Sequence, residues 1–158
     1  MLRKIAGIAA VGGVAVFGIG SIDNTTRNEQ GTIVESGELG AFVTQVGDCF
    51  FEIPQNAQGV STVPGVPCVE AHHWQVVHKE NISLDEYSQA SVSALAGQVC
   101  DRALEELTST LSYDKQLEYQ NAKTPGLLPT EESWAKGDRT VDCLVGSESE
   151  LYYSSILN

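Results

Sequence analysis

Hydrophobic residues change their spacing along the chain, and these changes predict the elements of the fold. Residues 83–111 carry apolar side chains at intervals of three and four, which is typical of a helix with one buried face. The segment opens with SLDE, in which Ser83 would cap the helix and Asp85 and Glu86 would stabilise its first turn. The pattern predicts one long helix over 83–111, with Cys100 on its buried face.

Three segments have the composition or the alternation of β-strands, namely 41–53, 74–78 and 139–145. Alternation within the second segment predicts that His78 faces the same side as Trp74. In the third segment, every second residue from Val141 onward is apolar and is expected to face the core. The stretch between the first two segments is rich in Pro, Gly and small polar residues, which predicts a loop.

A Gly-Asp pair precedes a cysteine in two of these strands, and such pairs are typical of turns. The residues are Gly47, Asp48 and Cys49 in the first strand and Gly137, Asp138 and Cys143 in the last. The two segments are therefore expected to be strands of one small sheet. Just before the last strand, Thr130 is expected to cap a short helical turn that presents Trp134.

These elements together predict an α+β fold for residues 40–147. The expected architecture is a small antiparallel sheet of roughly four or five strands with one long helix packed on a face. The tail at 148–158 fits either an edge strand or a frayed end. Residues 21–39 are polar and lack a sustained period, so they are predicted to form a flexible stalk.

Residues 1–20 have the features of a targeting segment. Arg3 and Lys4 precede an uncharged apolar run over 5–20, which is either a secretory signal peptide or an apolar anchor helix. Because positive charge stays inside, the rest of the chain is expected outside the cytoplasmic membrane. The favoured localisation is a single-pass protein held in the membrane through 5–20, and the alternative is secretion after cleavage.

Acidic residues dominate the composition. The chain carries 21 Asp and Glu against 9 Lys and Arg, a formal net charge of -12. A surface of this sign repels phosphate backbones and anionic lipid, so nucleic acid is excluded as an expected partner.

The four cysteines, an even number without a CxxC pair, predict two disulfides in an exported domain. Three connectivities are possible, and the favoured one joins Cys49 to Cys68 and Cys100 to Cys143. The competing interpretation is a zinc site made by Cys68 with His72, His73 or His78. Disulfides exclude such ligation, so neither a metal nor a cofactor is expected.

Several of these residues also form a pattern that resembles the actinobacterial septum formation domain family. The pattern comprises V-G-D-C-F, V-P-C-x-x-x-H, a cysteine within a long helix, and a closing P-T-x-x-S-W-x-x-G-D-R-x-V-x-C-L, and it covers about residues 40–146. The chain departs from the family where Ala71 replaces a proline and Gln75 a glutamate. The resemblance implies an extracytoplasmic envelope domain linked with cell division, and it implies no established catalytic residues.

The polar residues of these motifs are expected to have mainly structural roles. Arg139 is expected to pair with Asp48 or Asp138, and Trp134 to anchor the core. His72 has the best functional claim, because it lies beside a cysteine and two further histidines.

Three functions from different classes fit the sequence. The favoured one is a non-catalytic envelope module that binds a protein or cell-wall partner during septation or envelope growth. The second is an envelope-acting hydrolase that uses His72 with Asp48 or Asp138, which would require these groups to converge in an open pocket. The third is a structural domain that supports a membrane partner. An exposed apolar patch would favour the first of these.

Overall fold

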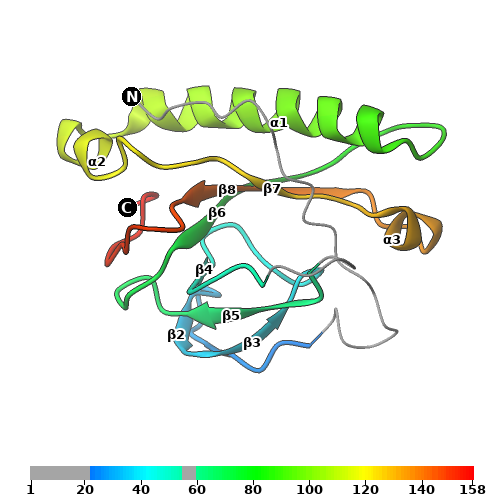
Figure 1. Cartoon of the computed structure of the whole chain (residues 1–158). Helices are drawn as coiled ribbons and strands as arrows, with labels where there is room; N and C mark the ends of the chain where they lie inside the picture. The colour runs from blue at the N-terminus through cyan, green and yellow to red at the C-terminus, as the bar shows by residue number, and fades with distance from the viewer. Residues whose placement is uncertain (1–21, 55–59) are drawn as a thin grey trace.

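The computed structural model describes residues 22–54 and 60–158, which fold around one antiparallel sheet and one long helix (Figure 1). The helices are α1 (Gln89–Thr110), α2 (Tyr113–Glu118) and α3 (Glu131–Ala135). The strands are β1 (Thr26–Arg27), β2 (Ile33–Glu35), β3 (Gly37–Gly40), β4 (Cys49–Phe50), β5 (Thr62–Val66), β6 (Trp74–Asn81), β7 (Gly126–Leu127) and β8 (Thr140–Gly146).

The main sheet has six strands in the order β3-β5-β4-β6-β8-β7, and β1 and β2 form a separate two-stranded sheet. All of these neighbouring strands pair antiparallel. The α+β prediction is therefore confirmed, but the sheet is larger than expected. The additional strands include β5, whose sequence TVPGV was predicted to be a loop because of its Pro and Gly.

The long helix is confirmed, but it begins at Gln89 and its N-cap is Ser88, so the cap expected at Ser83 was wrong. The residues before the cap are not helical and pack against the core instead. The ring of Tyr87 lies 5.9 Å from the ring of Trp134, and Leu84 packs against the same core cluster. Apolar residues before α1 therefore have helix-like spacing because they contact the core, and not because they are helical.

The alternation predicted for β6 fails at one residue. Val76 pairs with Leu144 and His78 pairs with Cys143, because the register shifts by a bulge between Val76 and His78. A bulge inserts an extra residue and moves the following side chains to the opposite face. His78 therefore lies on the face of Cys143, opposite to Trp74.

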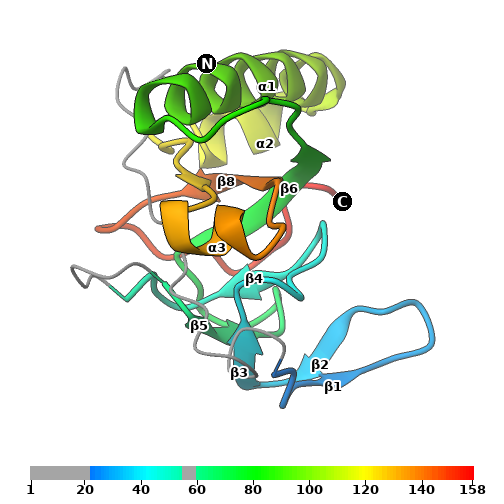
Figure 2. The same ribbon diagram turned by 90° about the vertical axis from the view of Figure 1, so that its right-hand side faces the viewer.

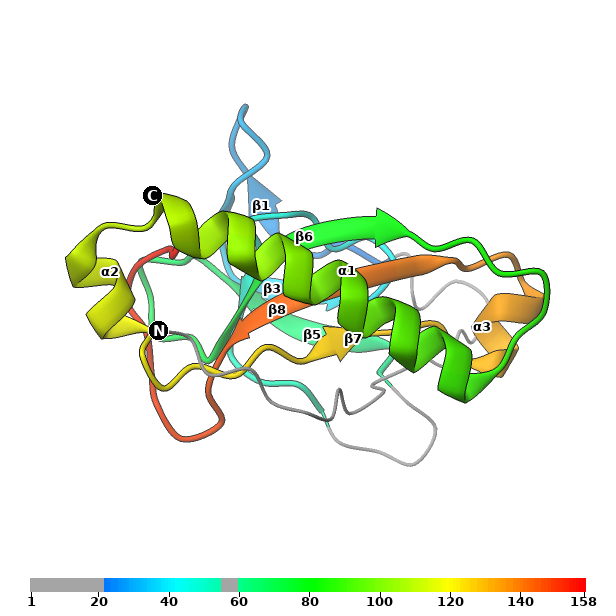
Figure 3. The same ribbon diagram turned by 90° about the horizontal axis from the view of Figure 1, so that it is seen from above.

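Both faces of β8 and of the first half of β6 are buried. On one face, Val141 and Cys143 pack against α1, which crosses β8 and β7 when seen from above (Figure 3). On the other face, Leu144 belongs to a cluster that includes Leu39 of β3 and Leu127 of β7. Because β3 and β7 are the two edges of the sheet, their shared cluster means that the sheet is partly rolled up around this core.

Residues 22–39 are part of the folded domain, so the stalk predicted over 21–39 is not what the described residues show. Leu39 is fully buried, and Ile33 is 4% exposed. The Asn28 side chain accepts bonds from the amides of Gln30 and Thr32, which closes the turn between β1 and β2. Figure 2 shows this hairpin projecting from the sheet. Its short strands lack the apolar period that would reveal them in the sequence.

The predicted anchor at 1–20 lies outside the described residues. Within 22–54 and 60–158, the structure has no helix that combines the length and the hydropathy of a membrane span.

Both favoured disulfides are present. Cys49 is bonded to Cys68, and Cys100 is bonded to Cys143. The second bond joins α1 to β8, as expected from their apolar patterns, and holds the helix on the sheet. Since Cys68 is oxidised, it is not available to ligate a metal, which removes the zinc site proposed around it.

We expect the Cys100→Ala/Cys143→Ala variant to lose about 3–4 kcal/mol of unfolding free energy, because the bond closes a separation of 43 residues. Urea denaturation of this variant and of the wild type would measure the loss. Cys49→Ala/Cys68→Ala, with a separation of 19 residues, should lose slightly less. A loss below about 1 kcal/mol for the first variant would mean that packing alone holds α1 in place.

Candidate functional site

Each predicted Gly-Asp turn is present and depends on its glycine. Gly47 has φ +100° and Gly137 has φ +97°, a backbone region that side chains rarely adopt. The amide of Gly47 bonds to the carbonyl of Val76, so the first turn is joined directly to β6. The second turn connects α3 to β8. The glycines thus fix where each cysteine-bearing strand begins.

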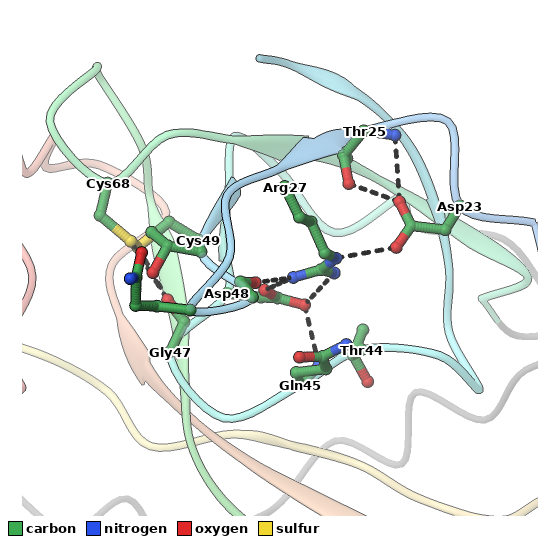
Figure 4. Close-up of polar contacts among 12 residues, drawn as sticks. Asp23, Thr25, Arg27, Thr44, Gln45, Gly47, Asp48, Cys49 and Cys68 are labelled. Atoms are coloured by element: carbon green, nitrogen blue, oxygen red, sulfur yellow. Dashed lines mark hydrogen bonds and ion pairs between the residues drawn. A yellow bond between two sulfur atoms is a disulfide. The ribbon is translucent and has the colours of Figure 1, made fainter. Parts of the chain in front are cut away.

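The buried carboxylate of the first turn has an ion-pair partner that the sequence did not reveal. Arg27 of β1 donates Nη1 and Nη2 to the two Asp48 carboxylate oxygens, at 2.7 and 2.9 Å (Figure 4). Arg27 also donates to Asp23, and the backbone amide of Gln45 donates to Asp48. The hydrogen bonds to Asp48 raise the pKa of Arg27 above its ordinary value. This network ties the N-terminal hairpin to the turn before Cys49.

Arg139 does not pair with either carboxylate, contrary to expectation. Its guanidinium stacks on the Trp134 ring, 3.5 Å from the centroid, and its Nη1 donates to the Trp134 carbonyl. Asp138 instead accepts from the Ser133 hydroxyl and the Thr140 amide. Thr130 caps α3, as expected, and Trp134 is buried beneath α1. The closing motif is therefore a structural unit that connects α3 to β8.

His72 is fully buried, and its Nδ1 lies 2.9 Å from the Glu70 carbonyl. Its Nε2 has no hydrogen-bond partner among the described residues. Desolvation by burial lowers the pKa of His72 below its ordinary value, which keeps the ring neutral. Among the described residues, no hydrogen bond or ion pair joins His72 to Asp48 or Asp138. The structure does not bring these three residues together as the hydrolase hypothesis requires.

Gln75, which stands where the resemblance predicts glutamate, connects the first turn to the C-terminal tail. It is 1% exposed, and its Nε2 donates to the Gly47 carbonyl and the Ser155 hydroxyl at 3.1 and 2.8 Å. Its Oε1 accepts from the Ile156 amide. A carboxylate could accept the third bond but could not donate the first two. The amide therefore determines how the tail is held.

The tail at 148–158 is ordered and packed, although the sequence left it undecided. Tyr152 pairs with His72 through backbone bonds, and its ring stacks on Tyr119 with centroids 4.2 Å apart. Lys115 of α2 donates to Ser154 and to the Ser155 carbonyl. The last residues of the chain thus form part of the surface beside the Cys49–Cys68 bond.

A second buried polar cluster contains residues that sequence reasoning missed. Asp142 of β8 is 2% exposed and accepts from the Thr44 hydroxyl, and one of its oxygens lies 3.2 Å from the Lys79 ammonium. Burial raises the pKa of Asp142, whereas Lys79 opposes this shift. The adjacent cavity has a volume of about 20 Å³, too small for an organic substrate. An acidic residue in an otherwise apolar strand was the signal that could have identified this cluster.

Exposed apolar side chains gather at one end of the sheet, where β5 ends, β6 begins and β8 ends. Figure 1 shows that the C-terminus and α2 lie at this end as well. We call this surface the apolar end. It consists of Val46, Phe51, Val69, Tyr113, Leu117, Leu151, Tyr153 and Leu157. Within it, the Phe51 ring lies 5.3 Å from the ring of His73, whose Nδ1 is 2.7 Å from the Glu150 carbonyl.

The apolar end is distinctive because nearly all large exposed apolar side chains of the described residues belong to it. Val34, in the projecting hairpin, is the exception. Exposed apolar patches mark protein or membrane interaction sites and ligand-binding grooves.

Breaking the Arg27–Asp48 pair should destabilise the domain. In Arg27→Gln, the carboxylate of Asp48 stays buried, with a side chain 3% exposed, without its cation. We expect a loss of roughly 3–5 kcal/mol of unfolding free energy, measured by urea denaturation. Arg102→Gln is the control, because its pair with Glu80 is exposed and should contribute less than about 1 kcal/mol. Equal losses in the two variants would contradict a special role for Arg27.

The free energy of unfolding should decrease as the pH is lowered, because of the titration of His72. Because burial lowers its folded pKa, only the unfolded state takes up the proton as the pH falls below about 6.5. We expect the wild type to lose up to about 1.4 kcal/mol per pH unit below that point, until the folded pKa is reached. His72→Phe should lack this component, whereas His73→Asn should keep it. An identical pH dependence in His72→Phe and wild type would show that His72 does not contribute.

Comparison with known proteins agrees with the resemblance read from the motifs. A family model described as septum formation matches residues 21–143, which includes the N-terminal hairpin. That description links the chain with cell division or the cell envelope. No curated protein and no solved structure matches the chain. The match covers most of the sequence, and the chain belongs to the septum formation family.

Proposed function

We propose that this protein is a non-catalytic binding module of the cell envelope that engages a partner during septation or envelope growth. The apolar end is the observation that supports this function. Leu151 is 42% exposed and Tyr153 is 61% exposed, both beside backbone that Gln75 and Lys115 hold in place. A backbone that is already held in place loses less conformational entropy on binding, which favours association.

The position of the chain's entry into the domain is consistent with this role. The carbonyl of Ile22 accepts from the amide of Gly40, which pairs with Thr62 at the beginning of β5. The apolar end lies at the other end of β5, after Val66. If residues 5–20 anchor the chain in the cytoplasmic membrane, as we propose, the domain lies outside it, and the chain enters the domain at the end of β5 opposite to the apolar end.

A test in cells would compare variants of the full chain in a strain that lacks the gene. The proposed function predicts that this strain spaces its septa abnormally. We expect Leu151→Ser/Tyr153→Ser to leave most of this defect uncorrected, because both substitutions remove apolar surface without touching the core. Microscopy with a membrane stain would measure the distance between septa, and immunoblotting would confirm equal abundance.

Val34→Ser is the matched control, since Val34 is 47% exposed but lies in the projecting hairpin, outside the apolar end. This variant should restore normal spacing. Full restoration by Leu151→Ser/Tyr153→Ser would overturn the proposed function.

A further inference from the structure

We infer that the apolar end recognises a basic, apolar segment of a partner protein, with Lys or Arg side chains interspersed among large apolar ones. This inference rests on the proposed function and specifies its partner. It comes from the way that acidic residues are distributed around the exposed apolar side chains.

Exposed acids flank the apolar side chains directly. Three apolar residues from three different segments each have an exposed acidic residue next to them in the chain. The pairs are Phe51 with Glu52, Val69 with Glu70, and Leu151 with Glu150. A partner that buries these apolar groups would also come close to the carboxylates. Basic side chains would complement them, whereas acidic ones would be repelled.

The helix α2 repeats this arrangement. Its two exposed apolar residues, Tyr113 and Leu117, are each followed by an exposed acid. The nearby Lys115 pairs with Glu118 at 3.2 Å and so offsets one of these two charges, whereas no ion pair is found for Asp114 among the described residues. Most of the negative charge around the apolar end is therefore available to a partner.

The same charges argue against other occupants. A second copy of this chain would bring two acidic rims together, in a protein whose formal net charge is -12. Anionic lipid would be repelled for the same reason. A cationic apolar segment would bury the exposed apolar side chains and pair with the acidic residues around them.

Synthetic peptides of equal length would test this inference on the full chain. One contains leucine and lysine, the second leucine and glutamate, and the third serine and lysine. Fluorescence anisotropy would measure each Kd at low and high salt. We expect the leucine-lysine peptide to bind at least about tenfold more tightly than either of the others. Its binding should weaken with salt, because exposed charges are screened.

Paired variants locate the binding. We expect Leu151→Ser/Tyr153→Ser to increase the Kd of the leucine-lysine peptide by about tenfold. Glu52→Gln/Glu70→Gln should reduce the salt dependence, while Val34→Ser/Glu86→Gln, which changes an apolar and an acidic residue elsewhere, should change neither quantity.

The outcomes separate this inference from the proposed function. Equal affinity for the leucine-glutamate peptide, or no binding of any peptide, would overturn the basic partner. Self-association of the chain, or its binding to phosphatidylcholine vesicles, would also overturn the basic partner if Leu151→Ser/Tyr153→Ser abolished it. The septum-spacing defect of that variant would still support a binding role. Peptide binding as expected together with normal septum spacing would instead contradict the proposed function alone.

Discussion

The pairing of β6 with β8 is the constraint on which the rest of the structure depends. β8 and the first half of β6 are buried on both faces, so one face must be covered by α1 and the other by the rolled remainder of the sheet. The Cys100–Cys143 bond holds α1 against β8. The strands that cover the opposite face are short, and polar contacts outside the sheet position them. Among the ion pairs of the described residues, that of Arg27 with Asp48 is the most buried.

The first strand segment shows how a short strand is held by its surroundings. β4 has two residues and cannot be stable by its own hydrogen bonds. Gly47 provides the positive φ, Asp48 is neutralised by Arg27, and Cys49 is bonded to Cys68. Gln75 then connects this turn to the C-terminal tail. The V-G-D-C motif is therefore the place where the hairpin, the sheet and the tail meet, and the apolar end is built on it.

The placement of His72 illustrates how a residue with a suggestive neighbourhood can have a structural role. Two histidines and a cysteine lie near it in the sequence, but the bulge and the disulfide separate them. Cys68 is oxidised, His73 faces Phe51, and His78 lies on the helix side of β6. His72 itself is buried next to the backbone of the tail. Its neutral ring allows that burial, at the expense of stability in acid.

The sequence by itself determined the long helix, the last strand, the presence of two disulfides and the two Gly-Asp turns, because each depends on local period, on glycine conformation or on cysteine chemistry. The family was identified from the pattern of motif residues. The structure selected the favoured disulfide pairing among three possible ones. Only the tertiary structure decided the other features. The residues of β3 and β5 show no alternation of apolar and polar side chains. Leu39 and Pro64 are in strands because β3 and β5 pair with each other. The partner of Asp48 lies 21 residues away, and the tail is ordered by Gln75. Long-range pairs of this kind leave no local pattern, and the apolar end consists of several segments that only folding brings together.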